Sequence, residues 1–324
     1  MRKVIGIGET ILDIIFLNNQ PERAVPGGST FNCIISLRRC NIPAEFISES
    51  GNDKVGRYLL DFMKENSLST DHIDIYKEGN SPVSIAFLDE NQQAEYQFFR
   101  AFPKHRLQVT FPKIYANDIL IISSYFALNP ELREKVFALI SYAKQQKAII
   151  YYDINFRRAH ASERDALLPI FLENVSYSSL VRCSDEDLEC LFPGENIENI
   201  YNKYIASRCK NLIITYGKNA TFLKTAHFEA NFPVEEIAPV STIGAGDNFN
   251  AGIIYGLMVN DILSRDLTNL SEKQWGELIE YGHVFAKNAC LSLENFVSSS
   301  FCNIYNFKSS SSCSSSSSSS GSGF

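Results

Sequence analysis

The chain has 324 residues, of which 45% are hydrophobic and 21% charged, which suits a globular protein with an ample core. Its 30 basic and 37 acidic residues give a net charge of −7 without a long basic run, which argues against nucleic acid or an anionic membrane surface as the main partner. The cysteines form no C-x-x-C pair, so we expect no zinc knuckle or disulfide framework, and a reducing, cytoplasmic setting. No apolar run approaches the roughly 20 residues that span a bilayer, so no membrane partner is expected.

Strand-like and helix-like segments alternate along the chain, the pattern of a parallel sheet covered by helices. The expected strands are residues 3–9, 44–50, 118–126, 148–156, 211–217 and 234–240. The expected helices are residues 29–40, 56–67, 131–146 and 272–293, together with a helix that opens near residue 245. The sequence therefore predicts an α/β fold.

Residues 73–100 interrupt this alternation, because no helix signal occurs there. The runs VSIAFL and EYQFF flank the polar turn DENQQ and predict a hairpin. Together with residues 16–28 this hairpin would form a small β lid, although a plain surface hairpin fits as well. The end of the chain is serine-rich, and we assign residues 294–324 to a low-complexity tail outside the domain of residues 1–293, disordered or artefactual.

The stretch STIGAGDNFNAGIIYGL, residues 241–257, places a glycine-rich turn at the start of a helix. Phe249, Ile253 and Leu257 recur at four-residue spacing, and glycines on the same stripe predict close packing on a neighbouring element. The first backbone N–H groups of a helix lack partners within it and attract anions, phosphate above all.

Asp247 stands in this turn, although a carboxylate repels the phosphate that the amides attract. One interpretation is a first-turn acid that stabilises the helix dipole. The other is that the amides of Gly244, Ala245 and Gly246 hold a transferring phosphoryl group while Asp247 takes the proton of the attacking hydroxyl. This loop alone does not decide between them.

Two further pieces suit a polar ligand. PGGSTFN puts Gly27 and Gly28 before a helix that carries Asn32, where the backbone can approach a ligand closely. Asp13 follows the first expected strand, and open α/β sheets bind ligands beyond the carboxyl ends of their strands.

With these pieces, the sequence resembles the ribokinase-like (PfkB) carbohydrate kinases up to about residue 293. The first signature of the family is similar to the glycine pair at residues 27–28 with Asn32 and the following GNDKVGRYL. Its second signature is similar to STIGAGDNFNAG. DINFR and ITYGKNA resemble its D-x-N-x-R and T-x-G-x-x-G segments. The resemblance implies a three-layer sandwich with a central, mainly parallel sheet and a small β lid.

The resemblance also implies roles for individual residues. Asp247 would be the catalytic base, and the turn before it the anion hole. Sugar-binding positions would be Asp13, Gly27, Gly28, Asn32, Arg100 and Arg157, and nucleotide-binding positions Ser184, Thr215, Gly217 and Asn288.

Two departures from the family pattern concern ions. Ser241 stands where relatives carry an aspartate of a monovalent-cation site, which puts K⁺ activation in doubt. Ser184 and Asp187 replace the N-x-x-E motif that relatives link to magnesium through water, although a solvated acidic helix start explains this run as well. Mg²⁺ is still expected, since the nucleotide phosphates bring most of its ligands.

We therefore expect an ATP-dependent sugar kinase that converts fructose to fructose 6-phosphate. The rival is a 2-keto-3-deoxygluconate kinase. In those kinases, arginines at places similar to Arg100 and Arg157 hold the substrate carboxylate, but fructokinases also carry arginines at these places, so the resemblance leaves both open. A non-catalytic sugar- or nucleotide-binding regulator on the same fold is a third possibility. The resemblance further suggests a homodimer formed through the lid.

Overall fold

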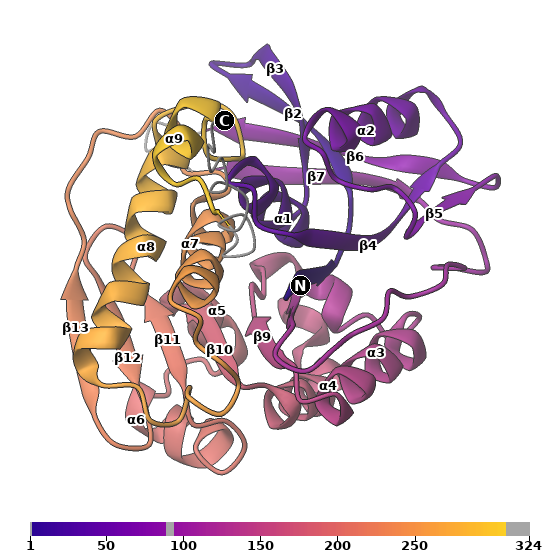
Figure 1. Ribbon diagram of the computed structural model, residues 1–324. Helices are drawn as coiled ribbons and strands as arrows, with labels where there is room; N and C mark the ends of the chain where they lie inside the picture. The colour runs from indigo at the N-terminus through magenta and orange to yellow at the C-terminus, as the bar shows by residue number, and fades with distance from the viewer. Residues whose placement is uncertain (1, 89–93, 309–324) are drawn as a thin grey trace, which may run out of the picture.

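The computed structural model describes residues 2–88 and 94–308, and its core is a nine-stranded sheet between two layers of helices (Figure 1). The sheet order is β13-β12-β11-β10-β9-β8-β1-β4-β5, parallel except at the edge strands β12 and β13. Its strands are β1 (Val4–Ile7), β4 (Ala44–Gly51), β5 (Ile73–Tyr76), β8 (Ile119–Ser123), β9 (Ile149–Asp153), β10 (Leu180–Ser184), β11 (Leu212–Thr215), β12 (Ala220–Lys224) and β13 (Glu229–Pro233). The predicted α/β class is confirmed.

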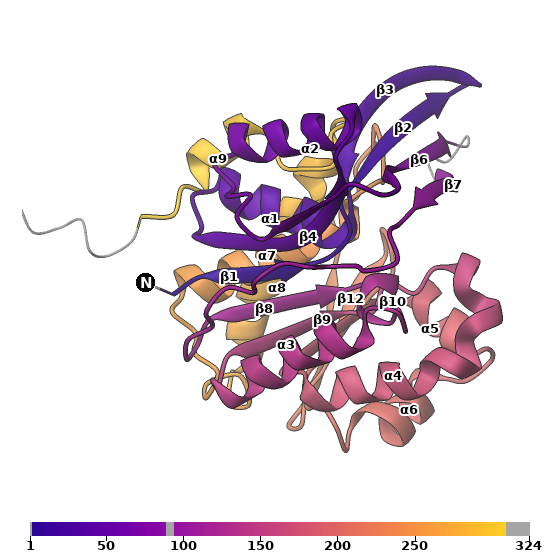
Figure 2. The ribbon, with the colours of Figure 1, turned by 90° about the vertical axis from the view of Figure 1, so that its right-hand side faces the viewer.

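Helices cover both faces of this sheet (Figure 2). One layer contains α1 (Ser29–Arg39), α2 (Lys54–Glu65), α7 (Ala245–Val259), α8 (Glu272–Cys290) and α9 (Ser299–Ile304). The other contains α3 (Arg133–Gln145), α4 (Arg164–Tyr177), α5 (Asp185–Leu191) and α6 (Ile197–Ile200). Two apolar clusters fill the two spaces between sheet and helices, and the central strands are buried on both faces, as their continuous apolar runs require. No helix in the described part of the chain is long and apolar enough to cross a membrane.

A second, four-stranded sheet projects from the body in Figure 2, in the order β3-β2-β6-β7. Its strands are β2 (Ile11–Leu17), β3 (Gln20–Gly27), β6 (Asn80–Leu88) and β7 (Ala94–Ala101), which we call the small sheet. The predicted hairpin pairs β6 with β7, and its turn at residues 89–93 lies outside the described residues. The expected limits of the lid need correction, because β2 begins at Ile11 and residues 73–76 form the edge strand of the main sheet.

The helix α7 packs against α8 along the predicted glycine stripe. A Cβ on Gly252 would lie 2.2 Å from the carbonyl oxygen of Tyr281, so no side chain fits between the two helices there. The strand expected at residues 234–240 is absent: β13 ends the sheet at Pro233, so the following residues have no partner strand.

The chain remains packed on the body well past residue 293. Phe296, Val297, Phe301 and Cys302 are buried, and α9 lies on the same apolar cluster as α1 and α8. The predicted domain boundary after residue 293 therefore falls before the end of the packed chain; of the expected tail, residues 309–324 lie outside the described part.

Candidate active site

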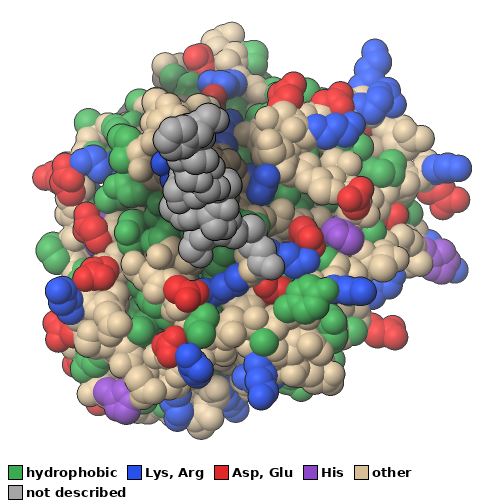
Figure 3. Space-filling view, in the orientation of Figure 1, with side chains coloured by type: hydrophobic (Ala, Val, Ile, Leu, Met, Phe, Trp, Pro, Cys, Tyr) green, Lys and Arg blue, Asp and Glu red, His purple; other side chains and the backbone are tan. Residues whose placement is uncertain are grey.

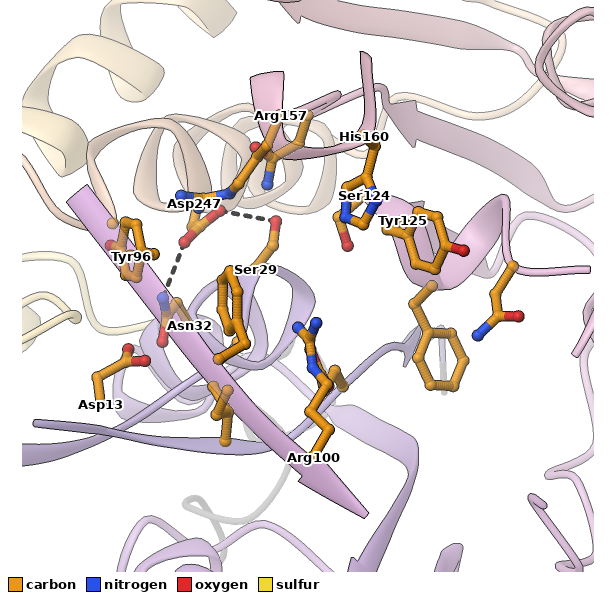
Figure 4. Close-up of a pocket in the computed structure, with 18 of the residues that line it drawn as sticks. Asp13, Ser29, Asn32, Tyr96, Arg100, Ser124, Tyr125, Arg157, His160 and Asp247 are labelled. Carbon is orange, nitrogen blue, oxygen red and sulfur yellow. Dashed lines mark hydrogen bonds and ion pairs between the residues drawn. The ribbon is translucent and has the colours of Figure 1, made fainter. Parts of the chain in front are cut away.

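A pocket lies beyond the carboxyl ends of β1, β8 and β9, between the small sheet and the start of α7 (Figure 4). Open α/β sheets bind ligands at this edge. Sequence-predicted residues that line it are Asp13, Gly28, Asn32, Arg100, Arg157, Gly244 and Asp247. The fold thus brings together side chains that are more than 200 positions apart in the sequence.

The turn before α7 needs glycine for a geometric reason. Gly244 has φ 76°, in the left-handed region, and a Cβ there would meet the carbonyl oxygen of Asn295 at 2.9 Å. The N–H of Ala245 donates to the carbonyl of Thr242 at 3.2 Å, which closes the turn. The next amides, Gly246 and Asp247, belong to the first turn of α7, where an N–H has no acceptor within the helix. This end of α7 suits an anion.

Asp247 is buried at this end of α7. Its carboxylate accepts from the Ser29 hydroxyl and from Nδ2 of Asn32, both at 2.8 Å (Figure 4). Both donors belong to the first turn of α1, whose N-terminal neighbour Gly28 has φ 126°. Burial raises the pKa of Asp247 to about 6, although the two hydrogen bonds oppose this rise. A carboxylate of this pKa is ionised at neutral pH and basic enough to take a proton.

Asp13, on β2, is a second buried carboxylate in the pocket with a matching set of partners. Its oxygens accept from the Ser84 hydroxyl at 2.5 Å and from Nδ2 of Asn295 at 3.0 Å. Burial raises its pKa to about 6 as well. Asn32 lies between the two carboxylates in Figure 4, and all three side chains line the same pocket.

The arginines of the pocket differ in their partners. Arg100 makes a bidentate ion pair with Glu9, with both distances 2.7 Å. Arg106 pairs with the buried Glu49. Arg157 lies over the ring of Tyr96 at 4.7 Å, and within the described residues no carboxylate lies in ion-pair distance of it.

The residues predicted to bind the nucleotide do not line this pocket. Two of them, Ser184 and Thr215, lie opposite each other at the carboxyl ends of the paired strands β10 and β11. The Thr215 hydroxyl accepts from Arg182 at 2.6 Å. Gly217 follows in the turn after β11 with φ 52°, and Asn288, on α8, accepts from the backbone N–H of Ser298 at 2.8 Å. Ser184 and Thr215 are thus together, whereas Asn288 bonds to the C-terminal segment.

Asp187 forms a capping box with Ser184 at the start of α5, which fits the helix-start interpretation of this acidic run. It is buried rather than solvated, and burial raises its pKa to about 6. No cluster of three or more metal-ligating side chains occurs in residues 2–88 and 94–308. A Mg²⁺ that keeps several waters and binds nucleotide phosphates needs only one such carboxylate nearby, so Asp187 fits an indirect role.

Three residues with a part in this geometry were missed from the sequence: Ser29, Arg182 and Asn295. Ser29 directly follows the glycine pair and could have been found there. Arg182 stands alone as a charge in an apolar strand, which is a visible signal. Asn295 lies beyond the domain boundary that the sequence predicted, and nothing local marks it.

A fold of this class with two buried carboxylates beside a helix N-terminus is suited to phosphoryl transfer, and comparison with known proteins identifies the family. The family model described as pfkB family carbohydrate kinase matches residues 1–294. The chain is 24% identical over 278 residues to a fructokinase of Rhizobium leguminosarum bv. trifolii, covering 83% of this chain and 84% of that protein. It is 27% identical over 249 residues to a 5-dehydro-2-deoxygluconokinase of Geobacillus kaustophilus, covering 72% of each.

Solved structures agree on the fold. A fructokinase from Vibrio cholerae O395, solved with fructose, ADP and calcium ion bound, superposes with a TM-score of 0.81 at 20% identity, covering 95% of this chain and 99% of that one. The chain belongs to the pfkB family of carbohydrate kinases and has the ribokinase-like fold. It is therefore a sugar kinase, and the non-catalytic alternative loses its support.

Proposed function

We propose that this enzyme transfers the γ-phosphoryl group of ATP to the 6-hydroxyl of fructose, with Asp247 as the base. The observation that carries the proposal is the buried Asp247 at the start of α7, with a pKa of about 6. Asp247 takes the proton of the sugar 6-hydroxyl while the oxygen of that hydroxyl bonds to the γ-phosphorus. The bond from that phosphorus to the oxygen of ADP breaks, and the amides at the start of α7 stabilise the charge on the transferring group.

In this proposal the nucleotide lies along the ends of β10 and β11, next to Ser184, Thr215 and Gly217, with Asn288 nearby. Mg²⁺, held mainly by the phosphates, would neutralise their charge, and Asp187 would contact it only through water. Ser241 offers no carboxylate to a K⁺ ion: it is 2% exposed, and its hydroxyl accepts a hydrogen bond from the N–H of Ile243.

The charge of the pocket favours a neutral sugar. Arg100 and Arg106 are already neutralised by Glu9 and Glu49. An anionic substrate would have to compete with these carboxylates for the guanidinium groups. Fructose is therefore the first candidate, in agreement with the named fructokinase relative.

A sugar acid is the second candidate, and Arg157 is the observation that favours it. Its guanidinium lines the pocket without an ion pair to any described carboxylate, so it is available for bidentate bonds to a substrate carboxylate. The name of one relative, 5-dehydro-2-deoxygluconokinase, indicates a sugar acid as its substrate. The alternative expected from the sequence, a 2-keto-3-deoxygluconate kinase, would also act on a sugar acid.

A comparison of kcat/KM for fructose, 2-keto-3-deoxygluconate and 5-dehydro-2-deoxygluconate tests this choice. We expect fructose to have the highest kcat/KM of the three. Arg157→Lys should change this kcat/KM by less than about tenfold, because no hydrogen bond to a charged substrate group is lost. The neighbouring Arg158→Lys serves as control. If a sugar acid wins and Arg157→Lys removes mainly that activity, the fructose proposal is wrong and Arg157 binds a carboxylate.

We also propose that two copies pair through the small sheet. Its face turned away from the pocket is mainly apolar, with Glu95 and Gln97 of β7 as polar members. The apolar residues that alternate there with the pocket-facing ones are Leu12, Ile14, Phe16, Val83, Ile85, Phe87 and Phe99. Phe87 is 39% and Phe99 49% exposed. A second copy presents the same apolar face, so a two-fold contact buries both. The surface seen in Figure 3 instead has acidic and basic side chains interspersed.

Light scattering after size exclusion tests the dimer. The wild type should have twice the 36.5 kDa of one chain, and Phe99→Glu should give a monomer, because it buries a charge at the contact. Tyr58→Glu, at a residue 46% exposed on α2, is the control and should stay dimeric. A wild type that is monomeric at micromolar concentration contradicts the proposal.

A further inference from the structure

The segment that follows α8 reaches back into the active site through one side chain, Asn295. It is 1% exposed, and its Nδ2 donates to Oδ2 of Asp13 at 3.0 Å. Its backbone carbonyl accepts from Nδ2 of Asn248, in the first turn of α7, at 2.9 Å. Asn295 thus joins the carboxylate on the small sheet to the helix that carries Asp247.

The chemistry of the pair fixes the direction of the amide. An ionised carboxylate only accepts hydrogen bonds, so the nitrogen of Asn295 must face Asp13. Oδ1 of Asn295 is buried and has no hydrogen-bond partner in the described part of the chain, which costs free energy. Asn32 repeats the arrangement at Asp247, donating through Nδ2 while its Oδ1 lacks a partner in residues 2–88 and 94–308. Nδ2 of Asn295 also donates to the backbone carbonyl of Pro26 at 3.4 Å, which likewise requires the nitrogen on the side of Asp13. The shorter bond of Asn295, at 3.0 Å, is the one to the carboxylate.

The surroundings leave room for this contact and no more. A Cβ on Gly27 would lie 2.1 Å from Oδ2 of Asp13 and 3.1 Å from Nδ2 of Asn295, so any larger residue at position 27 would displace the pair. Ser84 holds the other oxygen of Asp13. With one donor on each oxygen, the carboxylate is fixed in orientation, and each oxygen keeps a lone pair for the pocket.

We propose that Asn295 is a positioning residue for sugar binding, which holds Asp13 ionised and oriented so that it accepts hydroxyl groups of the substrate. This inference rests on the proposed sugar kinase function and on the sugar-binding role that the family resemblance implies for Asp13. The titratable groups that face Asp13 are Arg157 from the loop after β9, Glu9 from the loop after β1 and Tyr96 on β7. Asn295 contributes a donor that does not titrate, so it acts at every pH at which Asp13 is ionised.

Two substitutions separate this role from a merely structural one. Burial raises the pKa of Asp13 to about 6 and the Asn295 bond opposes the rise, so sugar affinity of the wild type should fall as pH drops through about 6. Asn295→Ala removes a stabilising donor and moves this fall to higher pH. Asn295→Asp has the same shape, but its carboxylate repels Asp13 when ionised and donates to it when protonated. Affinity of that variant should therefore improve as pH falls over the range in which the wild type begins to weaken.

The experiment measures the dissociation constant of fructose, or of the sugar acid if the substrate comparison favours it, by calorimetry on the full chain between about pH 5 and pH 8. At pH near 7.5, Asn295→Ala should weaken binding at least about tenfold, the effect of losing one hydrogen bond to a charge. Its kcat should change by less than about threefold, because the bond serves binding rather than the chemical step. Asn303→Ala, at an exposed position of the same segment, is the control and should match the wild type.

Asp13→Asn distinguishes failure of the inference from failure of its basis. If Asp13→Asn leaves sugar affinity unchanged, Asp13 does not bind sugar and both proposals about this carboxylate are wrong. If Asp13→Asn weakens binding while neither Asn295 variant does, the inference about Asn295 alone is overturned. Should the Ala variant fail to fold, the pH trend of the isosteric Asp variant decides: improvement at lower pH supports the proposal, and a trend like that of the wild type overturns it.

Discussion

Asp247→Asn should lower kcat by a factor of about 10² to 10⁴, the usual cost of losing a general base, while the fold and ATP binding are kept. The asparagine has the same shape and can still bond to Ser29 and Asn32, but it cannot accept the hydroxyl proton. Steady-state kinetics and calorimetry with a non-hydrolysable ATP analogue measure the two quantities. Asp261→Asn, at an exposed aspartate just past the end of α7, is the matched control.

The same carboxylate predicts the pH dependence of the wild type. The base must be ionised to act, and burial raises its pKa to about 6, so kcat/KM should fall as pH drops below about 6. Burial also raises the pKa of Asp13 to about 6, so protonation of Asp13 contributes to the same fall in kcat/KM at low pH. An Asn variant that turns over within about threefold of the wild type would leave Asp247 with only the helix-capping role.

Arg182→Met should destabilise the protein by about 3–5 kcal/mol, the cost of breaking a buried ion pair on one side. Arg182 bonds to Asp153 at 3.1 Å, and the side chains are 8% and 0% exposed. The guanidinium also bonds to Thr215, and a Cβ on Gly246 would lie 2.9 Å from it, so the guanidinium lies directly against the first turn of α7. Without it, the Asp153 carboxylate keeps the Asn250 amide but has no ion-pair partner among the described residues.

Urea unfolding of three variants tests this account. Arg182→Met with Asp153→Asn should recover part of the loss, because the double variant buries no unpaired charge. Arg265→Met, which removes an arginine from an exposed pair with Asp266, should cost about 1 kcal/mol or less. Equal losses for the two single variants would show that Arg182 contributes no more than a surface pair.

The sequence predicted those parts of the fold that depend on local pattern. Phe249, Ile253 and Leu257 marked α7 by their spacing, and the polar turn between two apolar runs marked β6 and β7. The strand expected at residues 234–240 was wrong because a strand also needs a partner, and the sheet ends at β13. Local sequence carries no information about that limit.

The site was predicted only as far as motifs reach. Asp247, Asp13 and Asn32 came from recognisable short patterns, and the fold brings them into one pocket. Asn295 did not, because its contact with Asp13 joins residues 282 positions apart and its neighbours look like the start of a serine-rich tail. Arg182 could have been recognised from the sequence as an isolated charge in an apolar strand. Its partner Asp153 could not, because only the register of β9 and β10 brings the two residues together.

Phosphorus NMR of the purified protein with ATP, Mg²⁺ and fructose tests the central claim most directly. We expect the γ-phosphate resonance of ATP to disappear with the appearance of ADP and of a phosphate monoester at the 6-position of fructose, and Asp247→Asn to suppress both. A sugar acid that yields the monoester in place of fructose would correct only the substrate. Free phosphate alone, or no change with fructose or either sugar acid, would contradict the assignment of this pocket to sugar phosphorylation.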